Sequence, residues 1–393
     1  MIKRILYFMP DNPMSKNSGN KTHVLQMLDY FASRQNKVQL DYLGEETWSQ
    51  WSAEDKKAFN EKYPSINLHV LRRKGYKKNL LKYFFTYTLI NTIKKNRLLF
   101  FKKSMPDNNT HILQKKFNKL LAANVYDVII LSYVTWASLI YKNKLTGNAR
   151  LILDTHDFIT ALHKNKRGFN MGKAFAAEMK IINMFNDTWN QSADERYLFS
   201  QFAENTQHYF VPIMFKKTAA PDASPKNIDL IYVGSDNESN RVSIQWFFKE
   251  VYPLLPDNIN ICCIGKICNY IPEGLVNVTK HIFVDDLTEF YYASKIAICP
   301  MLKGTGVKVK VVEAVAFGLP VVCNLRGLDG LPIKENNGCL LSNTAQQFAD
   351  NILHLLSDEA FYTQTAQQAT AMFTQYFEQE KCYTHLDKIL QLD

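Results

Sequence analysis

The chain has 393 residues, of which 46% are hydrophobic and 21% charged, and it contains 25 Phe and 20 Tyr. This composition excludes disordered, collagen-like and low-complexity proteins, and the length indicates two domains of about 150–200 residues each. Residues 1–220 carry 34 Lys and Arg against 17 Asp and Glu, whereas the remainder carries 13 against 20, so the halves have net charges of +17 and −7. The basic first half therefore indicates an anionic partner.

Strand-like and helix-like segments alternate through the first half. Ile2 to Met9 predicts a buried strand, and a polar loop at 15–20 leads into a helix at Thr22 to Arg34. Further strands are predicted at Val38 to Leu43, Asn67 to Leu71, Val125 to Leu131, Leu151 to Asp154 and His208 to Val211, and helices at Asn109 to Ala123 and Lys173 to Trp189. This alternation predicts a parallel, doubly wound sheet.

The second half repeats the pattern after a proline-rich stretch. Three prolines and no apolar periodicity between Pro212 and Lys226 mark residues 213–227 as a linker, so we predict domains at 1–212 and 228–375, with a helix at about 376–393 packing back on the first. Strands are predicted at Ile228 to Val233, Ile259 to Ile264, His281 to Val284, Ile296 to Pro300 and Pro320 to Cys323, and helices at Val242 to Tyr252, Asp286 to Tyr292 and Val307 to Phe317. The predicted fold class is α/β, with two Rossmann-like doubly wound parallel-sheet domains.

The basic charge of the first half is concentrated between Arg72 and Lys103, where eleven basic residues occur without an acid. Aromatic and leucine residues lie among them, at Tyr83, Phe84, Phe85, Tyr87 and 98–101. Apolar clusters between cations are typical of an element that lies on an anionic membrane surface. An ordinary helix with a solvated basic face is the alternative, and no nucleic-acid partner is expected because no recognition motif accompanies the charge.

No segment of the sequence predicts a membrane span or a metal site. The longest apolar run, Val128 to Tyr141, contains Ser132 and Thr135 and is shorter than the roughly 18 residues that a spanning helix needs. All seven cysteines follow residue 260, and four of them lie in strand-like apolar runs (Cys262, Cys263, Cys299 and Cys323), which predicts reduced, buried thiols without zinc. We expect a cytoplasmic protein that is peripheral on the inner face of the membrane.

The segment from Ala297 to Leu331 is the richest in chemical features. A predicted strand ends at Pro300, the turn at 304–306 lets the backbone approach a ligand, and a helix begins whose free amides favour an anion. Lys308 and Lys310 lie in its first turn, where cations oppose the helix dipole unless an anion is bound. Glu313 follows on the same broad face, within reach of sugar hydroxyls. The pattern predicts a diphosphate site.

The sequence K-V-K-V-V-E-A-V-A-F-G-L-P-V-V at 308–322 resembles the group 1 retaining glycosyltransferases, which have the GT-B fold of two Rossmann-like domains facing a central cleft. Weaker likeness extends to 151–157, 228–235 and 281–294. The resemblance implies that Lys308 and Lys310 pair with phosphate and that Glu313 bonds the ribose hydroxyls. It also implies nucleotide-sugar contacts from Gly234, Gly265, Phe283, Val284, Gly304, Thr305, Gly306 and Val307, with a base held mainly by backbone, so UDP and GDP are not distinguished.

Two positions depart from the family pattern. Many members carry an acid eight residues before the glutamate, whereas this chain has Thr305, so the identity of the donor sugar stays open. The family's basic pair after the first strand of the second domain is also absent, because Ser235 follows Gly234. Arg241 is the candidate to replace that pair.

Two features of the first domain also carry the resemblance. His156 and Asp157 follow a predicted buried strand, and the carboxyl ends of parallel strands face the ligand crevice. By resemblance His156 contacts the transferred sugar or positions the acceptor, and Asp157 supports it. Gly19 lies in a loop that resembles the family's glycine loop over the phosphates, although an ordinary strand-to-helix connection explains it equally well.

The resemblance implies retaining transfer of a sugar from a nucleotide-diphosphate donor to a glycan or lipid-linked acceptor, in bacterial surface polysaccharide or glycoconjugate assembly. The expected catalytic residues are His156, Asp157, Lys308, Lys310 and Glu313, with no metal and no cofactor other than the donor. Two alternatives remain on the same fold. One is a catalytically weak relative that binds a nucleotide or glycan at the membrane, and the other is a sugar-nucleotide 2-epimerase.

Overall fold

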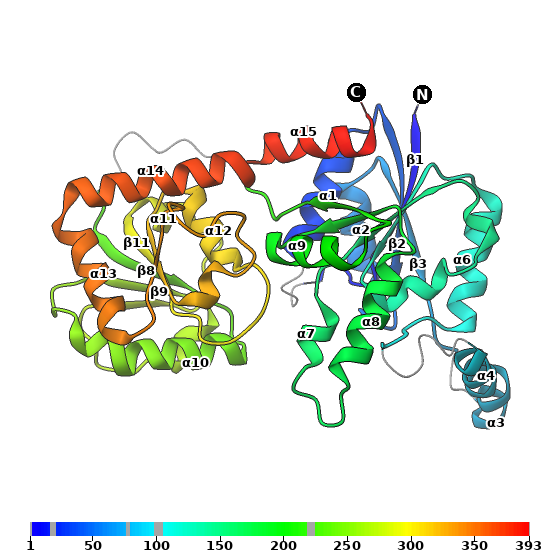
Figure 1. Ribbon diagram of the computed structural model, residues 1–393, viewed down its shortest axis with the longest axis horizontal. Helices are drawn as coiled ribbons and strands as arrows, with labels where there is room; N and C mark the ends of the chain where they lie inside the picture. Colours follow the sequence, from blue (N-terminus) through cyan, green and yellow to red (C-terminus); the bar gives the residue numbers. More distant parts are fainter. Residues whose placement is uncertain (1, 16–20, 76–78, 98–104, 218–224, 393) are drawn as a thin grey trace. The chain divides into compact units, whose positions relative to one another are not determined.

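A computed structural model describes residues 2–15, 21–75, 79–97, 105–217 and 225–392. The chain forms two compact units (Figure 1). The first comprises residues 1–191, 195–211 and 392, and the second comprises residues 192–194, 212–391 and 393. Within the described ranges, no helix is both long enough and apolar enough to cross a membrane.

The first unit is built on a seven-stranded sheet whose neighbouring strands are all parallel. Its order is β3-β2-β1-β4-β5-β6-β7. The strands are β1 (Lys3–Phe8), β2 (Val38–Glu45), β3 (Ile66–Leu71), β4 (Val128–Ser132), β5 (Arg150–Asp154), β6 (Asp187–Asn190) and β7 (Gln207–Phe210). The strand order reverses between β1 and β4, and in open parallel sheets such a reversal marks where ligands bind, beyond the carboxyl ends of the strands.

Helices connect these strands. They are α1 (Lys21–Ser33), α2 (Ala53–Lys62), α6 (His111–Ala123), α7 (Ile159–His163), α8 (Met171–Ile182) and α9 (Ala193–Phe202). Glu178, buried on α8, accepts hydrogen bonds from the backbone amides of Ile159 and Thr160 at 2.9 Å, so it caps the start of α7. A short 3₁₀ helix, Val134–Leu139, follows β4 and is buried throughout.

A separate helical segment precedes α6. It runs from α3 (Leu80–Tyr83) through a π-helical stretch (Phe84–Leu89) into α4 (Ile90–Arg97). Asn91 holds it to the rest of the unit, because its side-chain oxygen accepts the His111 amide at 2.8 Å. The apolar side chains on its other face are exposed by 39–75%, and they are Leu80, Leu81, Phe84, Phe85, Leu89, Ile90 and Ile93. We call these seven residues the exposed apolar face.

The second unit contains a six-stranded parallel sheet in the order β10-β9-β8-β11-β12-β13. Its strands are β8 (Ile228–Val233), β9 (Ile261–Ile264), β10 (Val278–His281), β11 (Ser294–Cys299), β12 (Val321–Cys323) and β13 (Cys339–Leu341). This sheet and the first six strands of the other follow the same Rossmann order, in which the reversal here lies between β8 and β11. The structure therefore confirms the predicted α/β class with two doubly wound parallel sheets.

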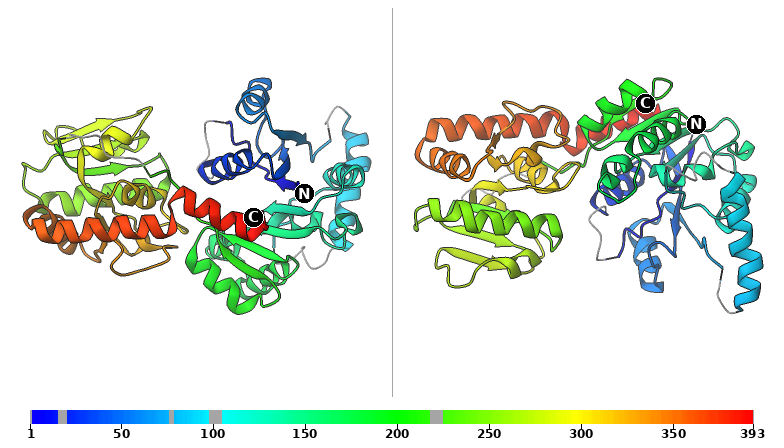
Figure 2. Two further views of the ribbon diagram at one scale, coloured as in Figure 1. Left: turned by 90° about the horizontal axis from the view of Figure 1, so that it is seen from above. Right: turned by 60° about the horizontal axis from the view of Figure 1, so that its bottom comes forward.

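Helices cover both faces of the second sheet, with α10 on one side and α14 on the other (Figures 1 and 2). The helices of the second unit are α10 (Glu238–Trp246), α11 (Thr288–Tyr292), α12 (Val309–Ala316), α13 (Ala345–Ser357), α14 (Glu359–Tyr376) and α15 (Gln379–Leu390). A π-helical stretch, Phe247–Val251, extends α10. Phe247, Phe348 and Ile352 pack on β8, β9 and β11 in a fully buried core.

Two predicted elements are wrong in their extent. The predicted helix Lys173 to Trp189 ends at Ile182, and Asp187–Asn190 instead forms β6. A four-residue strand is too short to interrupt a helical pattern visibly, and its polar residues are paired inside the unit, as in the ion pair of Asp187 with Arg150. The strand predicted at His281 to Val284 lies at Val278–His281, and β13 was not predicted. The strand was predicted too far along the chain because Ile282 and Phe283 are apolar, whereas the structure leaves both side chains exposed.

Candidate functional site

The carboxyl ends of β8 and β9 approach each other closely in the second unit. Gly265 has a φ of 108°, and a Cβ atom there would lie 2.2 Å from the carbonyl oxygen of Gly234. Any other residue would therefore collide with the backbone of β8. The two predicted glycines lie side by side at the edge where the strand order reverses.

The predicted turn before α12 has the backbone that its glycines favour. Gly304 and Gly306 have φ values of 106° and 71°, in the left-handed region. Thr305, between them, is exposed, and Val307 is half-buried. The helix begins at Val309, and Lys308 is its N-cap residue without a side-chain cap. The loop thus leads directly into the positive end of a helix dipole.

The two predicted lysines turn toward this loop and the neighbouring strand. Lys308 Nζ donates to the Gly306 carbonyl at 2.5 Å and lies 3.7 Å from Asp329, with 7% of its side chain exposed. Lys310 Nζ donates to the Asn240 side-chain oxygen at 3.0 Å and to the Tyr232 hydroxyl at 3.2 Å. It also lies 4.3 Å from the centre of the Tyr232 ring. We call Lys308 and Lys310 the lysine pair.

The environment of the lysine pair disfavours its positive charge. Burial lowers the pKa of Lys308, and Asp329 opposes this shift. Burial lowers the pKa of Lys310 to about 8, and the charge of Lys308 adds to the shift. Two partly desolvated ammonium groups at a helix N-terminus are stabilised by an anion with several oxygens, because it compensates both charges. The arrangement can bind a phosphate-like group.

Glu313 lies one turn further along α12. The Tyr291 hydroxyl donates to its carboxylate at 2.9 Å, and the Tyr291 ring stacks on Phe317 with 4.8 Å between ring centres. Burial raises the pKa of Glu313, although the Tyr291 hydrogen bond counteracts this. One carboxylate oxygen is thus fixed by the protein, and a carboxylate keeps further acceptor positions for a ligand hydroxyl.

The other residues predicted for the nucleotide lie at the same sheet edge with weaker constraints. Arg241, on α10, pairs with Asp236 and lies 4.7 Å from the Tyr270 ring, so its charge already has a partner. Phe283 is 78% exposed and Val284 half-buried, in the connection between β10 and α11. The structure brings together the glycines, the lysine pair and Glu313.

In the first unit, His156 and Asp157 follow β5 as predicted, and Gly19 lies outside the described residues. The His156 side chain is only 2% exposed, and its Nε2 lies 2.9 Å from Asp154. Burial disfavours the imidazolium, but the Asp154 carboxylate outweighs this and raises the pKa of His156. Asp157 is half-buried, and burial raises its pKa.

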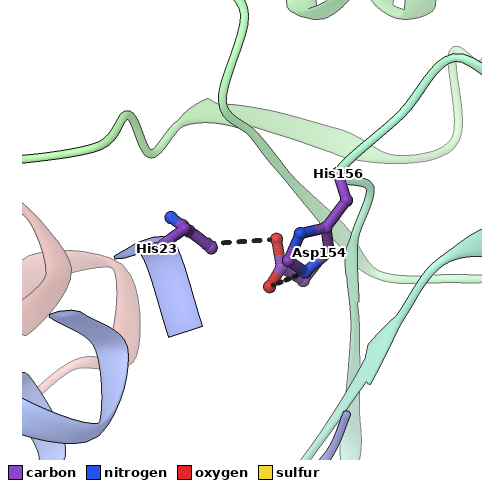
Figure 3. Close-up of side chains that lie close together, drawn as sticks. All are labelled: His23, Asp154 and His156. Carbon is purple, nitrogen blue, oxygen red and sulfur yellow. Dashed lines mark ion pairs between the residues drawn. The ribbon is translucent and has the colours of Figure 1, made fainter. Parts of the chain in front are cut away.

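Among the described residues, the side chains of His23, Asp154 and His156 form a group that could hold a metal ion (Figure 3). Their ligand atoms lie within 4.8 Å of one another. The His23 imidazole, from α1, lies 3.4 Å from Asp154. We call these three residues the His–Asp–His cluster.

The sequence patterns do not predict several residues that contact Lys310, Glu313 and His156. Tyr232 and Asn240 contact Lys310, Tyr291 fixes Glu313, and His23 and Asp154 surround His156. Lys310 and Asn240 are 70 positions apart, and no local pattern predicts such a contact. The position of Asp154 at the end of a buried strand was a usable signal, because a carboxylate in an apolar run needs a partner.

Comparison with known proteins finds similarity to a family model within the second unit and to a relative over the whole chain. Residues 227–358 match the family "Glycosyl transferases group 1". Over its whole length the chain is similar to an uncharacterized 44.6 kDa protein in the cps region of Klebsiella pneumoniae, with 22% identity over 98% of this chain and 99% of that protein.

Solved structures share the complete fold at low sequence identity. One is a sucrose-phosphate synthase from Thermosynechococcus elongatus, with 15% identity, a TM-score of 0.68, and 99% of this chain and 98% of that chain covered. Another is Alr3699/HepE from Anabaena in complex with UDP-glucose, with 15% identity, a TM-score of 0.66 and 99% of each chain covered. At this identity the likeness establishes the fold.

Proposed function

We propose that the protein is a retaining glycosyltransferase, because residues 227–358 match the group 1 glycosyl transferases and the whole chain shares the fold of a sucrose-phosphate synthase. It moves a sugar from a UDP or GDP donor to a hydroxyl group of a glycan or lipid-linked acceptor. The relative in a cps region and the HepE complex with UDP-glucose support a role in assembling a surface polysaccharide from a nucleotide sugar.

The lysine pair carries this proposal. Both ammonium groups are partly desolvated and lie at the start of α12, and a Cβ atom added at Gly306 would meet no other atom within 4 Å. A nucleoside diphosphate supplies the negative charge that this arrangement lacks, and the ribose hydroxyls then lie within reach of Glu313. Because Tyr291 orients Glu313, the ribose contact costs little further ordering.

The same residues support chemistry at the sugar. When the glycosidic bond to the diphosphate breaks, negative charge accumulates on the leaving oxygen. Lys308, Lys310 and the amides of the 304–307 loop are fixed before the reaction, so they stabilise that charge without reorganising. In a retaining transfer the acceptor hydroxyl attacks from the face that the diphosphate leaves, and no second carboxylate of the glycosidase type is needed.

The exposed apolar face supports attachment to a membrane surface. Seven large apolar side chains on one helical segment remain in contact with solvent, while Asn91 and α6 hold the opposite side. Exposed clusters of this size mark interaction sites. The surrounding sequence from Arg72 to Lys103 carries eleven basic residues and no acid, which favours anionic lipid as the partner.

The donor reaction is tested by incubating the purified protein with UDP- and GDP-sugars, first alone and then with a lipid-linked glycan acceptor, and by analysing the products. Formation of a glycosylated acceptor with retained configuration supports the proposal. Rearranged or hydrolysed donor in both arms identifies the epimerase alternative. Nucleotide binding without any product identifies the binding-protein alternative.

The membrane surface is tested by sedimentation with vesicles of neutral or anionic lipid. The wild type should bind anionic vesicles, and the double substitution Phe84→Glu/Phe85→Glu should abolish binding because it places charges in the apolar face. Leu145→Glu is the matched control, since Leu145 is 46% exposed elsewhere in the same unit. Binding should weaken as salt shortens the Debye length below about 10 Å. Equal binding to neutral and anionic vesicles contradicts the attachment.

A further inference from the structure

The His–Asp–His cluster lies at the carboxyl end of β5, where His23 from α1 approaches it (Figure 3). The side chains of His23 and His156 are each 2% exposed, and that of Asp154 is 0% exposed. Asp154 uses one carboxylate oxygen toward each ring: Oδ2 lies 2.9 Å from His156 Nε2, and Oδ1 lies 3.4 Å from His23 Nε2. The carboxylate therefore lies between two histidines from different elements, but among the described residues Oδ1 and both His23 ring nitrogens make no hydrogen bond.

Other side chains occupy the remaining positions around His156. Gln191 Nε2 lies 3.0 Å from the second ring nitrogen, Nδ1. The Tyr133 ring stacks on the imidazole with 4.5 Å between ring centres. Both ring nitrogens of His156 thus have protein partners, and neither can meet a sugar hydroxyl unless one of these contacts breaks.

A proton suits this cluster better than a metal ion. Two ligands of one zinc ion at about 2.0–2.2 Å lie roughly 3.4 Å apart in a tetrahedral site, whereas His156 Nε2 and Asp154 Oδ2 are at hydrogen-bond distance. Oδ2 also accepts the Tyr7 hydroxyl at 2.9 Å. Burial disfavours the Asp154 carboxylate, but the two histidines outweigh this and lower its pKa. The cluster is a bridged ion pair.

The backbone at this point is strained. His156 has a φ of 55°, which is uncommon for a residue other than glycine. The Asp157 amide donates to the Thr155 carbonyl at 2.6 Å, which closes a three-residue turn around His156. Tyr133, the stacking partner at the end of the adjacent strand β4, also has a positive φ, 63°. Such strain persists only where surrounding contacts over-determine it.

The turn brings Asp157 to the edge of the sheet. Asp157 is half-buried, and its carboxylate has no hydrogen-bond or ion-pair partner among the described residues. The charged and titratable groups around it and around His156 are Asp11 after β1, Tyr133 after β4, Asp154 on β5, Glu178 on α8 and His23 on α1. Asp157 is therefore the group at this turn that is available to accept a hydrogen bond from a sugar hydroxyl.

We propose that Asp154 is a positioning residue, which clamps the buried His156 ring and thereby holds the strained turn that presents Asp157 to a sugar hydroxyl. His156 then acts as an anchor and not as the group that contacts substrate. This inference rests on the proposed function for the identity of the ligand, while the clamp itself does not depend on it.

The clamp is tested by NMR titration of ring-labelled histidine, with His156 assigned through His156→Asn. Asp154→Asn should lower the pKa of His156 toward its ordinary range. Asp41→Asn is the matched control, because Asp41 is also buried in the first sheet and lies 3.7 Å from a histidine, His69. It should leave the His156 titration unchanged. His23→Gln keeps the Asp154–His156 pair and supplies a milder variant if Asp154→Asn does not fold.

The anchor role is tested by comparing His156→Asn with His156→Ala in sugar transfer. Asparagine tolerates the left-handed backbone and can donate to Asp154, whereas alanine can do neither. We expect the asparagine variant to stay within about tenfold of wild-type kcat and the alanine variant to lose about 100-fold, as misplaced catalytic groups do. Asp157→Asn should lower kcat by about 100-fold with unchanged nucleotide affinity.

Three results would overturn the proposal. An unchanged His156 titration in folded Asp154→Asn protein removes the clamp, and so does a His156 pKa in its ordinary range in His23→Gln protein, which keeps the Asp154–His156 pair. Equal loss of transfer in folded His156→Asn and His156→Ala shows that the ring itself contacts substrate. Loss of the histidine titration on adding stoichiometric Zn²⁺, with a rise in Tm, identifies a metal site. If the wild type transfers no sugar at all, the proposed function fails, and the titration still decides the clamp.

Discussion

Each of the two sheets ends in a buried cluster of charged side chains, but the two clusters are balanced differently. In the first unit, Asp154 lies between His156 and His23, so the positive charge has a negative partner. In the second unit, Lys308 and Lys310 mainly face carbonyl, amide and phenol groups, and Asp329 lies only at 3.7 Å from Lys308. A compensated cluster stabilises its own loop, whereas an undercompensated one is prepared for a charged ligand.

The largest effect is expected from removing the lysine pair. The double variant Lys308→Ala/Lys310→Ala should weaken binding of a nucleoside diphosphate by several kcal/mol, because each charge-assisted hydrogen bond contributes about 1.5–3 kcal/mol. Isothermal titration calorimetry with UDP and GDP measures the change. Lys303→Ala is the control, since Lys303 lies in the same loop and is exposed.

Replacing Lys310 alone should not lower the stability of the nucleotide-free protein. Lys310→Met keeps most of the side-chain volume and removes a charge that burial disfavours, so the Tm without nucleotide should stay equal or rise. Unaltered UDP and GDP affinity in the folded double variant contradicts the undercompensated charge. So does a large fall in Tm for Lys310→Met.

The two clusters should make the stability depend on pH in opposite directions. His156 binds its proton more tightly in the folded state, so its contribution is complete below the unfolded pKa of about 6.5 and is lost as pH rises through the folded value. Lys310 binds its proton less tightly when folded. Its cost is complete below about pH 8 and is relieved as pH rises toward about 10.4.

Denaturant unfolding measured from pH 5 to 10.5 separates these contributions. The two contributions are read as differences between the wild type and a variant: a loss of stability above about pH 6.5 and a partial recovery above pH 8. The difference is needed because burial also raises the pKa of thiols such as Cys263 and Cys299, which lowers the stability of every variant at alkaline pH. Asp154→Asn should remove most of the loss, and Lys310→Met should reduce the recovery. If each variant changes the free energy of unfolding by the same amount at every pH, neither group titrates as the structure indicates.

The sequence predicts the architecture well because it depends on patterns within short segments. Buried strands such as Ile228–Val233, alternating with helices, are sufficient to predict two parallel sheets. The glycine turn and the first-turn lysines are also local, so the sequence could predict where these residues, the candidate anion site, lie in the second unit. Short polar strands such as β6 could not, because their stability comes from neighbours distant in the chain.

The fine structure of the sites depends on contacts between distant residues and was not predictable. His156 was expected to contact a sugar, and that role stays a prediction, but the structure places its ring between Asp154 and Gln191. The contact with Gln191 spans 35 positions and requires the complete sheet. The apolar residues near 84 were expected to be accessible, and Phe84 and Phe85 are 49% and 59% exposed.

The smallest predicted effect separates two adjacent tyrosines that both pack on Phe317. The Tyr291 hydroxyl donates to Glu313 at 2.9 Å, whereas the Tyr292 hydroxyl is buried without a hydrogen-bond partner in the described part of the chain. Tyr291→Phe should therefore cost about 1–2 kcal/mol in stability and weaken nucleotide binding slightly, because Glu313 loses its orienting bond.

Tyr292→Phe serves as the matched comparison, since it removes an oxygen from the neighbouring ring at the same helix end. Removing a buried polar atom that lacks a partner should leave stability unchanged or raise it by up to about 1 kcal/mol. Thermal unfolding and calorimetry on both variants decide the point. If the two substitutions lower stability and nucleotide affinity equally, then ring packing on Phe317 dominates, and the Tyr291 hydroxyl does not orient Glu313.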